Sequence, residues 1–127
     1  MPVPSNRHYS DSHEWFQVEE DIVTIGITQH AADELTDITF VEMKPEGTAV
    51  AAGESLGEVE SVKTTSDVYS AINGEVIQVN TSVADDPSLV NSDPYDSGWL
   101  VKIRSSDLGP LNELMDGTTY DSRHASD

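Results

Sequence analysis

The sequence predicts a mainly β protein of one domain, built from two related β units with short helices at the edges. Short runs of β-branched and aromatic residues alternate along the chain with turns rich in glycine, proline and acidic residues, which is typical of antiparallel strands. A segment in the middle, TAVAAGESL (48–56), also matches a later one, TSVADDPSL (81–89), at five of nine positions. Similarity at this scale indicates two β units related by a pseudo-twofold axis.

The first third of the chain predicts a hairpin, a short helix and a further strand. Two β-favouring runs, 15–18 and 22–28, flank an acidic turn of three residues, as expected for a hairpin. Thr28 is a residue type that caps helix N-termini, and the small and acidic residues after it predict a helix over about 28–35. The run ITFVEM (38–43) predicts the next strand.

The middle of the chain predicts a second hairpin with a lysine at its tip. Lys63 lies in GEVESVKTTSDVYSAINGEV (57–76), ten residues after Gly53 and eleven before Gly74, so it is near the midpoint of two arms of similar length. The repeat, extended at its offset of 33, maps Lys63 onto Asp96 in the turn-forming run DPYDSG. We therefore expect a second hairpin tip at that position.

The C-terminal part predicts a second helix over about 106–116. Ser106 is a suitable N-cap, and Gly117 can supply a left-handed residue at the end. The apolar residues between them have a helical spacing: Leu108, Leu111, Leu114 and Met115. The ends of the chain, 1–6 and 121–127, are polar or rich in proline, and we expect them to be mobile ends of a single domain, 1–127.

The chain is strongly acidic. It has 24 Asp and Glu residues against 6 Lys and Arg residues, and its formal net charge is -18. Such a charge repels phosphate backbones and anionic lipids, so we expect neither nucleic acid nor a membrane as a partner. The carboxylates are spread along the whole chain, which is typical of a hydrated surface that stays soluble in concentrated salt, and we hypothesise a halophilic host.

The composition excludes several kinds of site. Cysteine is absent, which removes disulfides, thiolate catalysis and cysteine-based metal sites. The pair His13-Glu14 lacks the second histidine of a zinc motif, and the other histidines are scattered, so we expect no metal. No stretch approaches the roughly 18 apolar residues of a membrane helix, and the start has no signal-peptide features, which predicts a cytoplasmic protein.

The lysine at the predicted tip can have one of three roles. It can be a solvated side chain with no special role. A catalytic Schiff-base lysine needs a low pKa, obtained by desolvation or nearby positive charge, but Lys63 is expected to be exposed between Glu60 and Asp67. The third role is that of an acylated amine, in which the long side chain tethers a swinging cofactor.

A family resemblance favours the third role. The run ESVKTTSDVYSAINGEV (60–76) resembles the lipoyl-attachment segment of glycine cleavage system H proteins. Further runs look like segments of that family in the same order: SHEW (12–15), TIGIT (24–28), FVEM (40–43), INGEVIQVN (72–80) and LVNSDPYDSGWLVKI (89–103). Biotin carriers share the hairpin, but their lysine typically lies between methionines, whereas the neighbours here are Val62 and Thr64.

The resemblance implies a lipoyl/biotinyl-type barrel-sandwich hybrid fold and a carrier without catalytic residues of its own. Lipoic acid would be attached to Lys63 in amide linkage. The carrier would take the aminomethyl group of glycine from the decarboxylase (P protein) to the aminomethyltransferase (T protein), and dihydrolipoamide dehydrogenase (L protein) would reoxidise it. Lipoate-attaching enzymes are also expected as partners.

The resemblance also implies a cleft that shields the loaded arm. Ser12, Glu14 and Asp67 match positions that would bind the cationic amine of the cargo, and Ile27 and Leu35 match positions that would line the apolar part.

Two positions depart from the family pattern, and two other functions stay open. Thr36 stands where the family commonly has glycine, and Glu34 where it often has histidine. A left-handed backbone is less favourable for a β-branched threonine than for glycine, so we expect this substitution to affect the helix exit and the cleft wall beside it. The first alternative is another kind of lipoyl carrier, either an H-like lipoyl relay or a free-standing lipoyl domain of another complex. The second alternative is a binding module that carries no lipoate.

Overall fold

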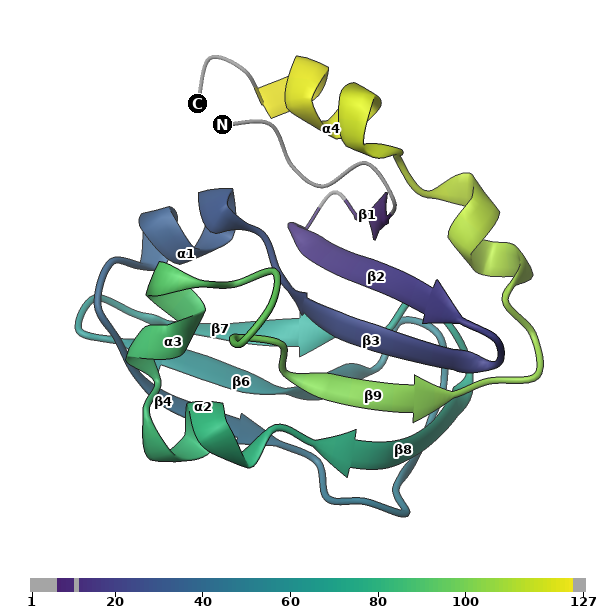
Figure 1. The fold of residues 1–127 in the computed structure, drawn as a ribbon, viewed down its shortest axis with the longest axis horizontal. Coiled ribbons are helices and arrows are strands. Elements are labelled where there is room, and N and C mark those ends of the chain that lie inside the picture. The colour runs from purple at the N-terminus through teal and green to yellow at the C-terminus, as the bar shows by residue number, and fades with distance from the viewer. Residues whose placement is uncertain (1–6, 11, 125–127) are drawn as a thin grey trace.

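The structure, a computed structural model, describes residues 7–10 and 12–124. These residues form a mainly β fold with short helices at the periphery (Figure 1). The strands are β1 (His8–Tyr9), β2 (Glu14–Glu19), β3 (Ile22–Ile27), β4 (Ile38–Met43), β5 (Ala49–Val50), β6 (Ser55–Ser61), β7 (Thr65–Tyr69), β8 (Gly74–Val79) and β9 (Val101–Arg104). The helices are α1 (Gln29–Leu35), α2 (Thr81–Asp85), α3 (Ser88–Ser92), the 3₁₀ helix η1 (Gly109–Glu113) and α4 (Gly117–His124).

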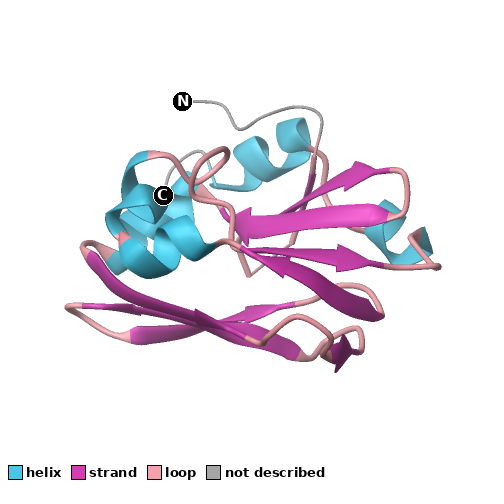
Figure 2. Cartoon of the chain, turned by 60° about the horizontal axis from the view of Figure 1, so that its bottom comes forward, coloured by secondary structure: helices cyan, strands magenta, loops and turns pink. Residues whose placement is uncertain are grey.

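The strands form two antiparallel sheets. One has six strands in the order β1-β2-β3-β9-β8-β5, and the other has three in the order β4-β6-β7. Figure 2 shows the sheets as two layers with the helices around them. This arrangement confirms the predicted barrel-sandwich fold.

The main core lies between the two sheets. Val23 and Ile25 of the six-stranded sheet and Val59 and Val68 of the three-stranded sheet belong to one buried apolar cluster. Burial of such side chains is the main favourable term in folding, about 1.5–3 kcal/mol for each one. The core fixes the sheets relative to each other and thereby positions the segments that emerge from their ends.

The predicted elements of the first third are confirmed. Strands β2 and β3 form the hairpin, paired from Glu14 opposite Ile27 to Glu19 opposite Ile22. Helix α1 follows at once, and the Thr28 side chain accepts a hydrogen bond from the Ala31 N–H at its start. An N-cap of this kind satisfies one of the free N–H groups of the first turn, which is why the helix begins there.

The predicted sequence repeat does not correspond to a structural repeat. Residues 48–56 contain β5, a turn and the start of β6, whereas 81–89 form α2 and the start of α3. The Asn80 side chain accepts from the Ser82 N–H and caps α2, and Gly53 (φ +88°) provides the turn after β5. The five shared residues, Thr, Val, Ala, Ser and Leu, occur in both kinds of structure, so their similarity does not specify one of them. Asp96 accordingly lies in a turn between α3 and β9, and the prediction of a hairpin tip there is wrong.

The predicted helix over 106–116 is also wrong in its extent. The segment contains only η1, and α4 begins at Gly117, the residue expected to end the helix. Ser106 caps neither helix; Asp116 Oδ1 instead accepts from the Thr119 N–H in the first turn of α4. The predicted mobile ends, 1–6 and 121–127, lie outside the described residues except for 121–124, which complete α4.

No helix within the described ranges is long and apolar enough to cross a membrane.

Candidate lipoyl-carrier site

Lys63 lies at the exposed tip of the hairpin formed by β6 and β7. Its backbone is fixed by Ser61, whose Oγ accepts from the N–H groups of Lys63 and Thr64 at 3.1 Å each. The predicted tip is therefore present. Among the described residues Lys63 forms no ion pair with Glu60 or Asp67, the two carboxylates nearest to it in sequence.

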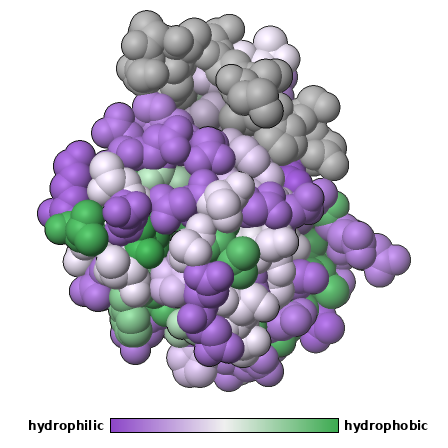
Figure 3. All heavy atoms as spheres, turned by 60° about the vertical axis from the view of Figure 1, so that its left-hand side comes forward, coloured by the Kyte–Doolittle hydropathy of each residue, from purple (hydrophilic) through white to green (hydrophobic). Residues whose placement is uncertain are grey.

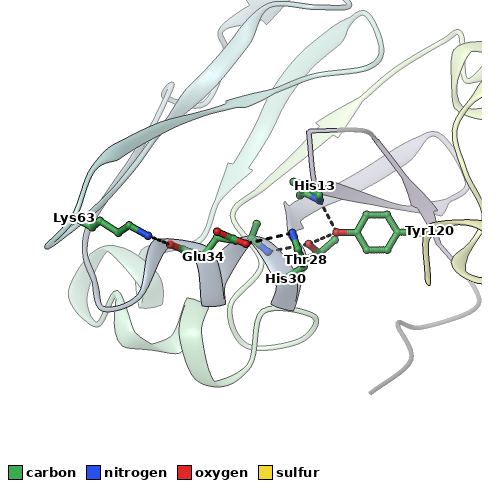
Figure 4. Close-up of polar contacts among 7 residues, drawn as sticks. His13, Thr28, His30, Glu34, Lys63 and Tyr120 are labelled. Carbon is green, nitrogen blue, oxygen red and sulfur yellow. Dashed lines mark hydrogen bonds and ion pairs between the residues drawn. The ribbon is translucent and has the colours of Figure 1, made fainter. Parts of the chain in front are cut away.

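The amine of Lys63 reaches the end of α1. Its Nζ donates to the backbone carbonyl of Glu34 at 3.1 Å, as Figure 4 shows. This carbonyl belongs to the last turn of the helix, where carbonyl groups lack partners within the helix and carry partial negative charge. A cation is favoured there, and an amide N–H can donate to the same oxygen.

A pocket of about 140 Å³ lies beside this contact. All five residues that the resemblance assigns to a cleft line this pocket: Ser12, Glu14, Ile27, Leu35 and Asp67. They come from β2 and the loop before it, β3, α1 and β7, so the pocket opens between the ends of the two sheets and the helix. Figure 3 shows the face that carries α1 and the hairpin, where hydrophilic side chains predominate and hydrophobic ones are scattered among them.

The pocket has apolar walls, and its polar side chains are carboxylates together with Ser12, His13 and Ser66. Ala31 of α1 and two valines of the three-stranded sheet, Val59 and Val68, complete the apolar lining. Glu34 adds a third carboxylate to Glu14 and Asp67. Among the residues that the structure describes, no lysine or arginine lines the pocket. Such a lining fits an apolar chain that ends in a cationic group, and the root of a chain attached to Lys63 would stand at the Glu34 edge.

Glu14 is the buried end of the site. It is only 2% exposed and pairs with Ile27 across the β2–β3 hairpin. Its Oε1 accepts from the hydroxyls of Ser10 and Ser12, and its Oε2 accepts from the Tyr69 N–H at 3.1 Å. Burial raises the pKa of the Glu14 carboxyl above its ordinary value, although these hydrogen bonds act in the opposite direction.

Asp67 lies at the open side of the pocket. Its Oδ2 accepts from the Tyr69 hydroxyl at 3.3 Å, and both side chains are exposed. The negative charge of Asp67 raises the pKa of the Tyr69 hydroxyl, because the carboxylate disfavours a phenolate beside it. Asp67 and Glu14 therefore contact the same tyrosine, one through its hydroxyl and the other through its backbone N–H.

The helix exit has the strained backbone that the sequence indicates. Thr36 has φ +63° and ψ -137°, a region that glycine adopts more easily. Asn91 holds this exit: its Nδ2 donates to the Thr36 carbonyl at 2.5 Å and its Oδ1 accepts from the Ile38 N–H at 3.0 Å. The hydrogen bonds from Asn91 therefore hold the backbone at the exit of α1 in place although the position has no glycine.

The sequence did not predict the contacts that connect α1 to α4 and to the loop before β2. The Tyr120 hydroxyl of α4 lies 2.8 Å from Thr28 Oγ1 and 2.7 Å from His13 Nδ1 (Figure 4). The rings of His13 and His30 are 4.5 Å apart, and His30 Nε2 lies 3.9 Å from Glu34 Oε1. No local signal in the sequence reveals the Tyr120 contacts, because Tyr120 is about 90 or more positions from its partners, whereas His30 and Glu34 have the i, i+4 spacing of a helix pair.

The fold and the site define a small carrier protein that presents one lysine on a hairpin beside a pocket with apolar walls. Residues 7–127 match the family model described as "Glycine cleavage H-protein", and the chain belongs to this family.

Individual relatives agree with this assignment. The chain is 42% identical to the glycine cleavage system H protein of Alcanivorax borkumensis, over 95% of this chain and 94% of the relative. It is 46% identical to the mitochondrial H protein 2 of Arabidopsis thaliana, over 88% of this chain and 72% of the relative. A crystal structure of an H protein from Mycobacterium marinum superposes with a TM-score of 0.89 at 36% identity, over 97% of this chain and 99% of that one.

Family membership establishes the class of function. The chain is a lipoyl carrier of the glycine cleavage system and not itself an enzyme, and lipoic acid is its cofactor.

Proposed function

We propose that Lys63 is the lipoyl attachment residue and that Ser12, Glu14, Ile27, Leu35 and Asp67 shield the loaded arm. The observation that carries the proposal is the contact between Lys63 Nζ and the Glu34 carbonyl, because Glu34 also lines the pocket that contains the other five. Lys44 follows strand β4 and Lys102 lies in β9, and neither lines this pocket. Lipoic acid would supply a reactive disulfide that the cysteine-free chain lacks.

Glu14 would hold the cationic end of the cargo. An ionised carboxylate can accept about four hydrogen bonds. Three positions are used by Ser10, Ser12 and the Tyr69 N–H, and none of these donors is charged. A cationic amine would supply the missing counter-charge at a buried carboxylate, where charge pairing is worth more than in water. Asp67, at the open side, would contact the same amine with a weaker, solvent-screened attraction.

The apolar walls would exclude water from the arm. Ile27 and Leu35 are 5% and 8% exposed, so they offer a preformed surface that moves little on binding. Contact with this surface also removes apolar area of the arm from water, which favours the folded-back position.

The partners follow from the carrier role. We infer exchange of the aminomethyl cargo with the P and T proteins, reoxidation by the L protein, and loading by lipoate-attaching enzymes. Residues 1–127 would act as a single carrier domain. The cytoplasmic location and the halophilic host stay predictions, and the Arabidopsis relative is itself named as mitochondrial.

Intact-mass measurement of protein from lipoate-sufficient cells tests the attachment residue. The expected result is one lipoyl increment in the wild type and in Lys44→Arg, and none in Lys63→Arg. An increment that persists in Lys63→Arg would contradict the assignment. Reconstitution of the lipoylated protein with P and T proteins then separates glycine cleavage from a lipoyl-relay role. Only glycine cleavage requires the arm to accept the aminomethyl group from the P protein and to deliver it to the T protein.

Release of the cargo tests the shielding residues. Loaded Glu14→Ala and Asp67→Ala proteins should lose the cargo to water faster than the wild type, with the larger effect at the buried Glu14. Unchanged release in both variants would remove these residues from the proposal.

A further inference from the structure

The hairpin tip depends on one hydroxyl group. A serine hydroxyl has one donor and two acceptor positions. Ser61 uses all three within the turn: its Oγ accepts from the N–H groups of Lys63 and Thr64 and donates to the Thr64 carbonyl, each at 3.1 Å. A backbone bond from the Ser61 N–H to the Thr64 carbonyl, at 2.8 Å, closes the same turn.

Packing does not fix this tip. Val62 is 69% exposed, and Lys63 and Thr64 are exposed as well. A further backbone contact is the hydrogen bond from the Val62 N–H to the Asp37 carbonyl, at 3.1 Å. A turn without buried side chains has little to restrict its backbone except hydrogen bonds, so the Ser61 hydroxyl has more influence here than at a buried position.

The tip also directs the lysine. From its position after Ser61, the Lys63 side chain extends to the Glu34 carbonyl at the end of α1. The backbone is therefore held at one end of the side chain and the amine at the other, and the pocket lies beside the second contact. A change in the backbone of the turn would change the direction in which the Lys63 side chain extends from the hairpin.

We propose that Ser61 is a positioning residue for the acylation of Lys63: its hydroxyl holds the turn in the one conformation that a lipoate-attaching enzyme accepts. The proposal rests on the assignment of Lys63 as the attachment residue. In the reaction, neutral Nζ attacks the carbonyl carbon of an activated lipoyl group, the C–N bond forms, the bond to the leaving group breaks, and one N–H proton passes to solvent. Ser61 touches none of these atoms.

The proposal predicts a specific kinetic signature. Without the hydroxyl, the turn would occupy the accepted conformation for only a fraction of the time, and the apparent affinity would fall by that fraction. For Ser61→Ala we expect a roughly fivefold to tenfold higher KM for the carrier in lipoate attachment, with little change in kcat, because the bound state restores the conformation. Ser61→Thr retains the hydroxyl and should return KM to within about twofold of the wild type.

Thr65→Val is the matched control. It removes a hydroxyl from the same hairpin, where Thr65 Oγ1 makes one long contact with Glu60 Oε1 at 3.5 Å, and it leaves the turn untouched. The measurement is lipoate attachment by a lipoate–protein ligase with lipoate and MgATP, at varied carrier concentration, on full-length proteins whose melting temperatures are also compared. Thr65→Val should keep the wild-type KM.

The outcomes separate this proposal from the one on which it rests. If the wild type is not modified at Lys63, the attachment residue itself is wrong. If the wild type is modified at Lys63 and Ser61→Ala has an unchanged KM, only the role of Ser61 fails. An equal rise of KM in Thr65→Val, or no recovery in Ser61→Thr, would also overturn it.

Discussion

The two ends of the site are built in opposite ways. At the hairpin tip Lys63 is exposed, and its backbone is held by a single neighbouring side chain, Ser61. At the inner end Glu14 is 2% exposed and receives hydrogen bonds from residues that lie up to 55 positions away. A carrier needs one group that several partners can reach and one place that hides the cargo from water, and local turn chemistry serves the first need while long-range burial serves the second.

Helix α1 connects the two ends. Leu35 contributes to the pocket wall, and the carbonyl of Glu34 receives the lysine amine. At the start of the helix, Thr28 is held by the Tyr120 hydroxyl of α4. A side chain near the C-terminus therefore supports the element on which the lysine rests, which gives α4 a role in the geometry of the site.

The largest expected effect is at the exposed end. Lys63→Arg keeps the positive charge but removes the nucleophilic amine, so lipoate attachment and carrier activity should be lost completely. Because the side chain is exposed, the free energy of unfolding should change by no more than about 0.5 kcal/mol. Intact mass and urea unfolding measure the two quantities. A large loss of stability would contradict the view that the tip contributes little to the fold.

The next effect is at the buried end. Glu14→Ala removes the acceptor of the Tyr69 N–H and of two hydroxyls, which should lower the free energy of unfolding by about 1–2 kcal/mol. Release of the amine cargo should accelerate roughly tenfold, because a charged hydrogen bond is lost.

Glu14→Gln is the matched control for this change. Its amide can still accept from the Tyr69 N–H, so stability should be close to that of the wild type, whereas release should be as fast as in the alanine variant because the negative charge is gone. Equal stability losses in both variants would show that the charge itself, and not the hydrogen bonds, stabilises this end.

A smaller effect is expected between the two ends, at the exit of α1. Thr36→Gly should raise the free energy of unfolding by about 1 kcal/mol, because relief of the positive-φ strain exceeds the entropy that a glycine loses on folding. Urea unfolding measures the change, with Thr39→Gly in strand β4 as a control that should be destabilised. A destabilised Thr36→Gly protein would mean that Asn91 and the threonine side chain already compensate the strain.

The sequence predicts local features well and distant ones poorly. The β2–β3 hairpin, the Thr28 cap and the Lys63 tip depend on residue types and spacings within a few positions, and all three are present. The prediction of a β unit over 81–89 is wrong, because its small polar residues suit a helix as well as a strand and the Asn80 side chain caps a helix there.

The same limit applies to the site. Family resemblance groups Ser12, Glu14 and Asp67, and the structure brings them to one pocket. The Tyr69 N–H that contacts Glu14 and the Tyr120 hydroxyl that contacts Thr28 have no pattern in the sequence, since each depends on how distant elements pack. Ser61 did have a local signal: a serine directly before an exposed turn often bonds to the turn's backbone.

The smallest expected effect is a pH dependence at the buried end. Burial raises the pKa of Glu14 in the folded protein, so between the ordinary and the raised value the folded chain binds more protons than the unfolded chain. Stability therefore falls as pH rises through this window and levels off above it. Glu14→Gln lacks this titration, so the stability of the wild type minus that of the variant should decrease with rising pH.

Urea unfolding of both proteins across the acidic range measures this difference, and the other carboxylates cancel because both proteins contain them. Loading with the amine cargo should flatten the decrease, because a cation beside Glu14 stabilises the carboxylate in the folded state. The exposed tip offers a contrast, since Lys63→Arg should leave the pH profile of the unloaded protein unchanged. If the difference in the free energy of unfolding between wild type and Glu14→Gln is constant or rises with pH, burial does not destabilise the Glu14 carboxylate. The proposal that Glu14 binds a cationic cargo would then lose its electrostatic basis.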